Sequence, residues 1–150
     1  MRLVREFRMS PVLLAMAVAL TVHAQSAPST PCRWLTAAEA AEVIGADVTL
    51  QMAVQDGACV YRNGPLRLQI AQPAWLVDTR ALRLGYDSMK KDRQGQDVPG
   101  IGEEAFVAGN RREIAFLKNQ AFVVVTIEGE GGDRHLAALK DAARKIADRF

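Results

Sequence analysis

The spacing of apolar residues changes several times along this chain, and the order of these changes limits the folds that it can adopt. Residues 36–45, 74–91 and 133–150 place apolar side chains three or four positions apart, as on one side of a helix. Apolar and polar residues alternate instead at 48–54 and 66–70, and further strands are expected at 59–62, 105–108, 112–118 and 121–128. The sequence therefore predicts a helix, three strands, a helix, three strands and a final helix.

This order of elements predicts the fold class. Runs of strands separated by single helices are typical of α+β proteins, so we expect an antiparallel sheet of about six strands with the helices packed on one face. The two halves of the chain share the pattern of one helix and three strands, and an internal duplication is one interpretation of this.

Local residues support several of the expected boundaries. Thr36 and Glu39 have the spacing of a capping box, and Gly45 suits the end of the same helix. Residues 63–64, Asn-Gly, are typical of a hairpin turn. Asp133 is the expected N-cap of the last helix.

Residues 1–24 have the features of a secretory signal peptide. Three arginines precede an uncharged run at 11–22, and small residues lead up to an expected cleavage site between Ala24 and Gln25. As a helix this run would extend only about 18 Å, whereas the apolar core of a bilayer is about 30 Å thick. We therefore expect secretion or a periplasmic location, without a stable membrane anchor after cleavage.

The expected mature chain consists of a flexible lead at 25–31 and one domain at 32–150. The full chain has 19 basic and 17 acidic residues, of which three and one respectively lie in residues 1–24, so the mature chain keeps 16 of each. A nucleic-acid-binding protein needs an excess of positive charge, and the short basic run at 90–93 does not supply it. We therefore expect no nucleic-acid partner.

Cys32 and Cys59 are the two cysteines of the chain. An even number of cysteines in an exported chain favours a disulfide, which would close a loop of about 28 residues and stabilise the fold by about 3–4 kcal/mol. A zinc site is the alternative, but the mature chain has a single histidine, His135, and no Cys-x-x-Cys pair.

Three short motifs, taken in order, resemble a known group of proteins. They are Cys32 followed by LTAAEA, the CVY at 59–61, and GIGEEAF at 100–106. In this respect the chain, from residue 32 to residue 150, is similar to a loose group of small secreted bacterial proteins and lipoproteins of unknown function. The resemblance implies an extracytoplasmic compartment, a disulfide and a fold type, but no catalytic residues. Residues 29–31 lack the lipid-attachment pattern of the lipoprotein members.

The segment VPGIGEEAF at 98–106 is the strongest candidate for an active-site loop. Gly100 and Gly102 suit a chain reversal before a strand, and a dinucleotide-binding loop would instead precede a helix. Glu103 and Glu104 would point to opposite faces of an extended chain, so they are not expected to act as an acid–base pair. We interpret the segment as a turn and keep each carboxylate as a single candidate binding residue.

Other catalytic or metal-binding sets have less support. His135 would need a serine partner, and no nucleophile motif surrounds Ser88. The acidic segment EGEGGD at 128–133 lacks the ligand spacing of a calcium loop. We expect no cofactor and no metal.

The segment AFVVVTI at 121–127 is apolar on both faces of a strand. If Phe122 and Val124 enter the helix-packed core, then Val123, Val125 and Ile127 lie on the opposite face. That face is either covered by the loop at 92–104 and by neighbouring side chains, or it is an apolar surface for a partner or a second copy.

These observations favour a secreted or periplasmic, non-catalytic domain that binds an envelope protein or a small apolar ligand. The alternatives are a small hydrolase or transferase that uses Glu103 or Glu104, and a structural component of the envelope. The oligomeric state is open.

Overall fold

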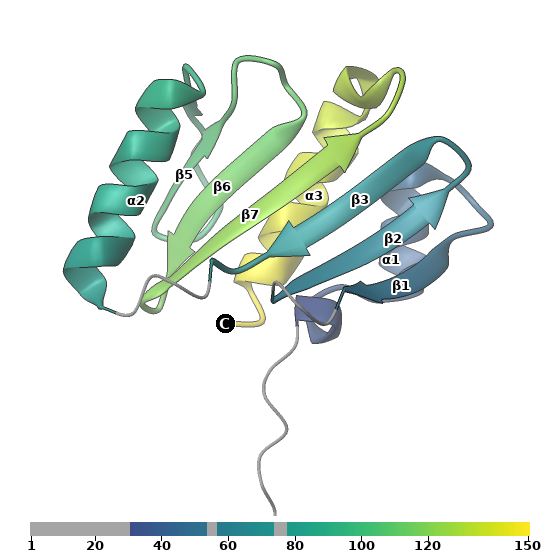
Figure 1. Cartoon of the computed structure of the whole chain (residues 1–150), viewed down its shortest axis with the longest axis horizontal. Coiled ribbons are helices and arrows are strands. Elements are labelled where there is room, and N and C mark those ends of the chain that lie inside the picture. Colours follow the sequence, from purple (N-terminus) through teal and green to yellow (C-terminus); the bar gives the residue numbers. More distant parts are fainter. Residues whose placement is uncertain (1–30, 54–56, 74–77) are drawn as a thin grey trace, which may run out of the picture.

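The computed structural model describes residues 31–53, 57–73 and 78–150, so the expected cleavage site at Ala24 and Gln25 lies outside the described residues. The chain forms the following elements in order (Figure 1): η1 (Pro31–Arg33), α1 (Ala37–Ile44), β1 (Thr49–Ala53), β2 (Ala58–Asn63), β3 (Leu66–Ala71), α2 (Thr79–Asp92), β4 (Gln96–Asp97), β5 (Glu104–Val107), β6 (Glu113–Lys118), β7 (Ala121–Glu128), η2 (Gly132–His135) and α3 (Leu136–Ala147).

The strands form one antiparallel sheet in the order β1-β2-β3-β7-β6-β5-β4. The expected α+β class and antiparallel sheet are confirmed. The additional strand, β4, lies in a segment that we expected to be an irregular connection. Gly95, which directly precedes β4, lies against the ring of Phe106 in β5. A Cβ at Gly95 would lie only 2.5 Å from Cδ2 of Phe106, so the absence of a side chain lets the chain approach β5 and pair with it.

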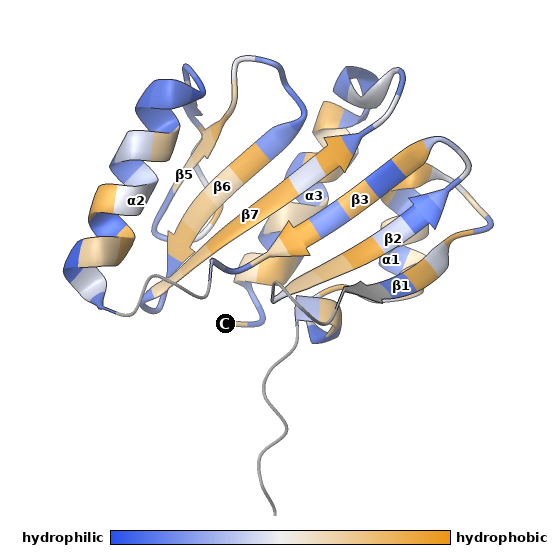
Figure 2. Cartoon of the chain, in the orientation of Figure 1, coloured by the Kyte–Doolittle hydropathy of each residue, from blue (hydrophilic) through white to orange (hydrophobic). Residues whose placement is uncertain are grey.

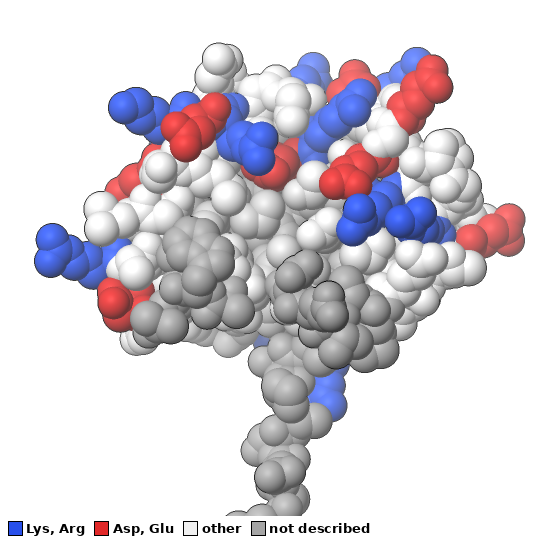
Figure 3. Space-filling view, viewed as in Figure 1, with Lys and Arg blue, Asp and Glu red and all other residues white. Residues whose placement is uncertain are grey.

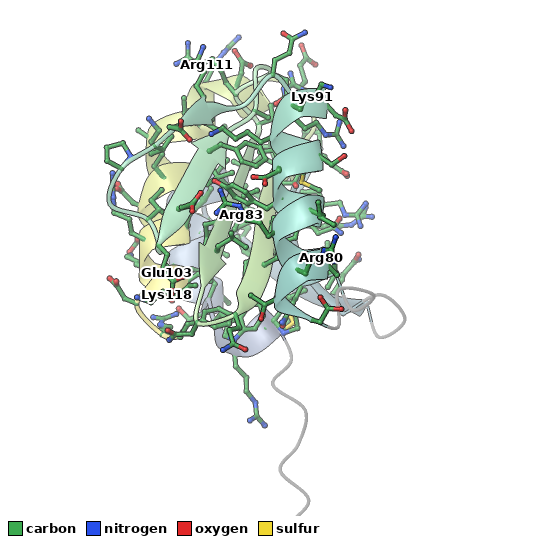
Figure 4. All side chains as sticks on the ribbon, turned by 90° about the vertical axis from the view of Figure 1, so that its left-hand side faces the viewer. Arg80, Arg83, Lys91, Glu103, Arg111 and Lys118 are labelled. Atoms are coloured by element: carbon green, nitrogen blue, oxygen red, sulfur yellow. A yellow bond between two sulfur atoms is a disulfide. The ribbon has the colours of Figure 1, made fainter. Side chains whose placement is uncertain are left out.

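The helices cover both faces of the sheet, which corrects the expectation that they pack on one face. Buried residues of α1 and α3 share one apolar core with β2, β3, β6 and β7. Leu82 and Tyr86 of α2 pack on the other face, against Phe106, Phe122 and Val124. Seen along the sheet, α2 and α3 lie on opposite sides of the strands (Figure 4).

Strand β7 is buried on both faces, so the second face of this strand is covered and is not an apolar surface for a partner. Val123, Val125 and Ile127 are 0 %, 0 % and 1 % exposed and belong to the core beneath α1 and α3. Phe122 and Val124 instead face α2. In Figure 2 β7 is hydrophobic along most of its length, whereas β3 alternates. The candidate docking residues are therefore core residues, because β7 lies at the centre of a three-layer arrangement.

The two sets of three strands are arranged symmetrically, but the helices are not. A twofold rotation axis that runs perpendicular to the sheet between β3 and β7 would relate β1-β2-β3 to β5-β6-β7. Such a rotation leaves each face of the sheet on its own side, so repeated helices would cover the same face. Because α1 and α2 cover opposite faces, a repeat of one helix-and-three-strand unit does not describe this fold.

The disulfide and the first helix agree with the sequence. Cys32 and Cys59 are bonded, with an S–S distance of 2.04 Å, and the bond attaches η1 to β2. Thr36 and Glu39 form the expected capping box at the start of α1. A disulfide is consistent with an oxidising compartment. None of the helices in the described part of the chain combines the length and apolar character needed to cross a membrane.

The starts of the other two helices differ from expectation. Asp133 is not an N-cap but lies within η2, one turn before α3 begins at Leu136. The 3-10 turn η2 packs closely on β7 at Gly132. A Cβ at this position would lie only 3.0 Å from Cγ2 of Ile127. Helix α2 begins at Thr79 with Asp78 as its N-cap, and the expected earlier start at 74–77 falls outside the described residues.

Candidate binding groove

Glu103 and Glu104 contact different parts of the structure and do not form a pair. Glu103 precedes β5, and its Oε1 accepts a hydrogen bond of 3.0 Å from the backbone N–H of Asn119 in the β6–β7 turn. Glu104 forms an ion pair with Arg83 and so connects β5 to α2. Figure 4 shows Glu103 near Lys118, whereas Arg83 lies between α2 and the strands. Gly102 has a φ of 58°, and the segment is the turn that we expected.

The other residues considered for catalysis or metal binding are not brought together. Ser88 is exposed on α2, whereas His135 precedes α3, and these two helices cover opposite faces of the sheet. In the acidic segment, Glu128 pairs with Arg67 at 3.1 Å and Asp133 with Arg112 at 3.8 Å. Within the described residues, no group of three or more His, Cys, Asp or Glu side chains could hold a metal ion.

An open groove lies on the α2 face of the sheet, beside α2. Its volume is about 510 Å³. Strands β3, β6 and β7 form its floor, the end of α2 forms one side, and the β5–β6 turn closes one end. Its lining includes Gln69, Ala71, Met89, Arg93, Asn110, Arg112, Glu113, Val124, Thr126 and Glu128. In the view of Figure 3, charged side chains gather on the upper part of this face.

The strand register divides the groove floor into rows that cross the sheet. Gln69, Thr126 and Glu113 lie side by side on β3, β7 and β6 and form a polar row. The next row contains Ala71 and Val124, and it continues beneath α2. The floor is therefore apolar toward one end and hydrogen-bonding toward the other.

Glu113 is the most unusual residue of the groove. It is 8 % exposed, which makes it the one charged residue among the buried residues of the described part of the chain. The Oε1 atom of Glu113 has no hydrogen-bond partner among the described residues. Arg93 Nε is 3.5 Å away, too far for a good hydrogen bond. A buried acceptor without a donor costs about 1–3 kcal/mol, so Glu113 is poorly explained as a stabilising residue.

The walls of the groove differ in how firmly they are held. Asn110 accepts a 3.0 Å hydrogen bond from the backbone N–H of Arg112, which holds the β5–β6 turn. Arg93 directly follows α2, and its side chain is 54 % exposed with one long ion pair, to Glu113. The Arg93 side chain is therefore less constrained than the β5–β6 turn.

Tyr86 of α2 is a second buried polar residue near the groove, since it belongs to the same apolar cluster as Val124 of the groove floor. Its hydroxyl has no hydrogen-bond partner among the described residues. Burial, and then the nearby charges of Glu104 and Asp97, raise the pKa of Tyr86 to about 12. Its hydroxyl therefore stays protonated near neutral pH and cannot act as a base or nucleophile there.

Sequence reasoning missed Glu113, although one signal was present. Glu113 alternates with Ala115 and Leu117 on one face of β6, so a single acid occurs on an otherwise apolar face. The other floor residues could not be found, because they depend on β3 pairing with β7 across more than 50 intervening residues.

Comparison of this chain with protein-family models, curated proteins and solved structures finds no significant match. The function must therefore be inferred from the geometry of the molecule itself.

Proposed function

We propose that this protein is a secreted or periplasmic, non-catalytic domain that binds its ligand in the groove beside α2. The observation that carries the proposal is the buried Oε1 of Glu113 in the floor of the open groove, which has no hydrogen-bond partner among the described residues and only a 3.5 Å ion pair with Arg93. Binding sites commonly combine apolar walls with a few fixed polar groups.

The shape of the groove favours an extended segment of another protein as the ligand. Along β7 the lining runs from Val124 to Glu128, a length of about 13 Å at 3.3 Å per residue. This length matches about four residues of extended chain. The row of Gln69, Thr126 and Glu113 can hydrogen-bond to a peptide, whereas a purely apolar small molecule would leave these groups without partners.

The proposal is tested by pull-down from the envelope fraction with the immobilised mature protein. Thr126→Trp fills the groove, and Gln51→Trp is its matched control, since Gln51 is exposed on the outer strand β1. We expect Thr126→Trp to remove most of the groove-bound partner and Gln51→Trp to leave it in place. Equal capture by wild type and Thr126→Trp would refute the proposal.

Glu113→Gln separates a binding role from a structural one. The change keeps the size of the side chain but removes a buried charge whose Oε1 has only a 3.5 Å ion pair with Arg93 and no hydrogen-bond partner among the described residues, so we expect unfolding stability to be unchanged or higher. Partner capture should nevertheless fall. A variant that is clearly less stable but captures its partner normally would assign Glu113 a structural role instead.

The alternative of a carboxylate-dependent enzyme has weaker support. Glu103 and Glu104, the residues that it would use, are engaged with Asn119 and Arg83. Turnover in a substrate screen that is lost in Glu104→Gln but not in Glu113→Gln would favour the enzyme over the groove.

A further inference from the structure

A second hollow, of about 520 Å³, lies at the end of the molecule between the β5–β6 turn and the start of α3. Its charged lining residues are Arg111, Arg134, Lys140 and Asp133. Figure 4 shows Arg111 at one extreme end of the molecule, far from Glu103. This hollow is separate in its chemistry from the groove, because basic side chains dominate it.

The three basic side chains of the hollow are not neutralised. Arg111, Arg134 and Lys140 form no ion pair with any other described residue. The acid of the hollow, Asp133, pairs instead with Arg112 at 3.8 Å. The mature chain has equal numbers of acidic and basic residues, so this local excess is not a consequence of general basicity.

The two segments that carry these residues are held together. The backbone N–H of Arg111 donates to the carbonyl of Ala108 at 2.8 Å, which closes the β5–β6 turn. A Cβ on Gly132 would lie 3.7 Å from Cδ of Arg112, so η2 packs against the same turn. Arg134 lies over Gly131, where an added Cβ would come within 3.8 Å of its Nε. The two segments that carry Arg111 and Arg134 are therefore held side by side by the fold.

From these observations we propose that the hollow binds a phosphate group, carried either by an anionic lipid of the envelope or by a soluble molecule. Arginine guanidinium groups form paired hydrogen bonds with phosphate oxygens, and a lysine adds a point charge. Arg111 and Arg134 come from two different segments and Lys140 from α3, and all three line the same hollow. The proposal is independent of the ligand in the groove.

The test is titration of the mature protein with inorganic phosphate at constant ionic strength, followed by calorimetry and by NMR. We expect NMR chemical-shift changes at Arg111, Arg134 and Lys140. In the double variant Arg111→Gln/Arg134→Gln, phosphate binding should be weaker by roughly tenfold or more. The matched control is Arg80→Gln/Lys91→Gln, which removes two exposed α2 cations that also form no ion pair with a described residue.

A second arm uses vesicles, with phosphatidic acid in phosphatidylcholine compared with phosphatidylcholine alone. Binding to free phosphate identifies a soluble source, and binding to phosphatidic acid vesicles alone identifies a lipid source; either result supports the proposal if the double variant loses it. No binding in both arms would overturn the proposal. An equal loss in the control variant would also overturn it, since general charge would then explain the binding.

Discussion

Replacing Glu39 by Gln should weaken the contact that attaches the C-terminal end of the chain to the start of α1. Arg149 donates two hydrogen bonds to the Glu39 carboxylate, at 2.6 and 2.9 Å. These bonds, together with those from Thr36, lower the pKa of Glu39 from 4.5 to about 2, although burial opposes the change.

The magnitude follows from this pKa. A difference of roughly 2.5 in pKa between the unfolded and folded states corresponds to about 3 kcal/mol at neutral pH. The Glu39 side chain is 17 % exposed and that of Arg149 36 %, so solvent screening reduces the value, and we expect a loss of about 1.5–3 kcal/mol. Gln keeps an oxygen that can accept from the Thr36 backbone, so the loss reports mainly the charge.

The pH dependence has a defined sign. Because folding lowers the pKa of Glu39, its contribution is present above the unfolded value of 4.5 and is lost as the pH falls toward about 2. Urea unfolding followed by circular dichroism should therefore show a large difference between wild type and Glu39→Gln at neutral pH and almost none near pH 2.

Glu42→Gln is the control for this experiment. Glu42 lies on the same helix and pairs with Lys145, but its side chain is 64 % exposed. We expect its replacement to change the unfolding free energy by less than about 0.5 kcal/mol. If Glu39→Gln costs no more than Glu42→Gln, or if its cost does not vary with pH, the reasoning about the Arg149 contact is wrong.

Two further predictions concern the disulfide and the turn before β5. Replacing Cys32 and Cys59 by Ser opens a loop with a sequence separation of 27 and should lower the unfolding free energy by about 3–4 kcal/mol in urea; a change below about 1 kcal/mol would contradict the loop-closure argument. Gly102→Ala should cost about 2–4 kcal/mol, because its φ is 58° and the new Cβ would lie 2.4 Å from the carbonyl oxygen of Leu117. Gly100→Ala has a φ of 76° but open space around it, so thermal unfolding should show a cost nearer 1 kcal/mol, and equal costs would exclude the steric explanation.

Much of the local structure could be predicted from the sequence. The capping box of Thr36 and Glu39, the hairpin turn near Gly64 and the apolar stripe of α3 depend on residues within a few positions of one another. The disulfide could be predicted as well, since an exported chain with two cysteines has one intramolecular pairing available.

The candidate site was largely beyond sequence reasoning. Glu113 carried a weak signal through its position on β6, but Gln69 and Thr126 became its neighbours only through the pairing of β3 with β7. The hollow at Arg111 and Arg134 likewise needs the β5–β6 turn to lie beside η2. Such contacts join residues that are distant in sequence, and no local periodicity encodes them.

The sequence by itself determined the class of the fold, because alternation and helical spacing are properties of neighbouring residues. Tertiary structure alone decided which face each helix covers. Since the residues of β7 from Ala121 to Ile127 are nearly all apolar, either face of this strand could lie beneath a helix, and alternation there indicates no direction. Packing α2 on one face and α1 and α3 on the other buries both, and this arrangement makes Val123, Val125 and Ile127 core residues rather than a surface for partners.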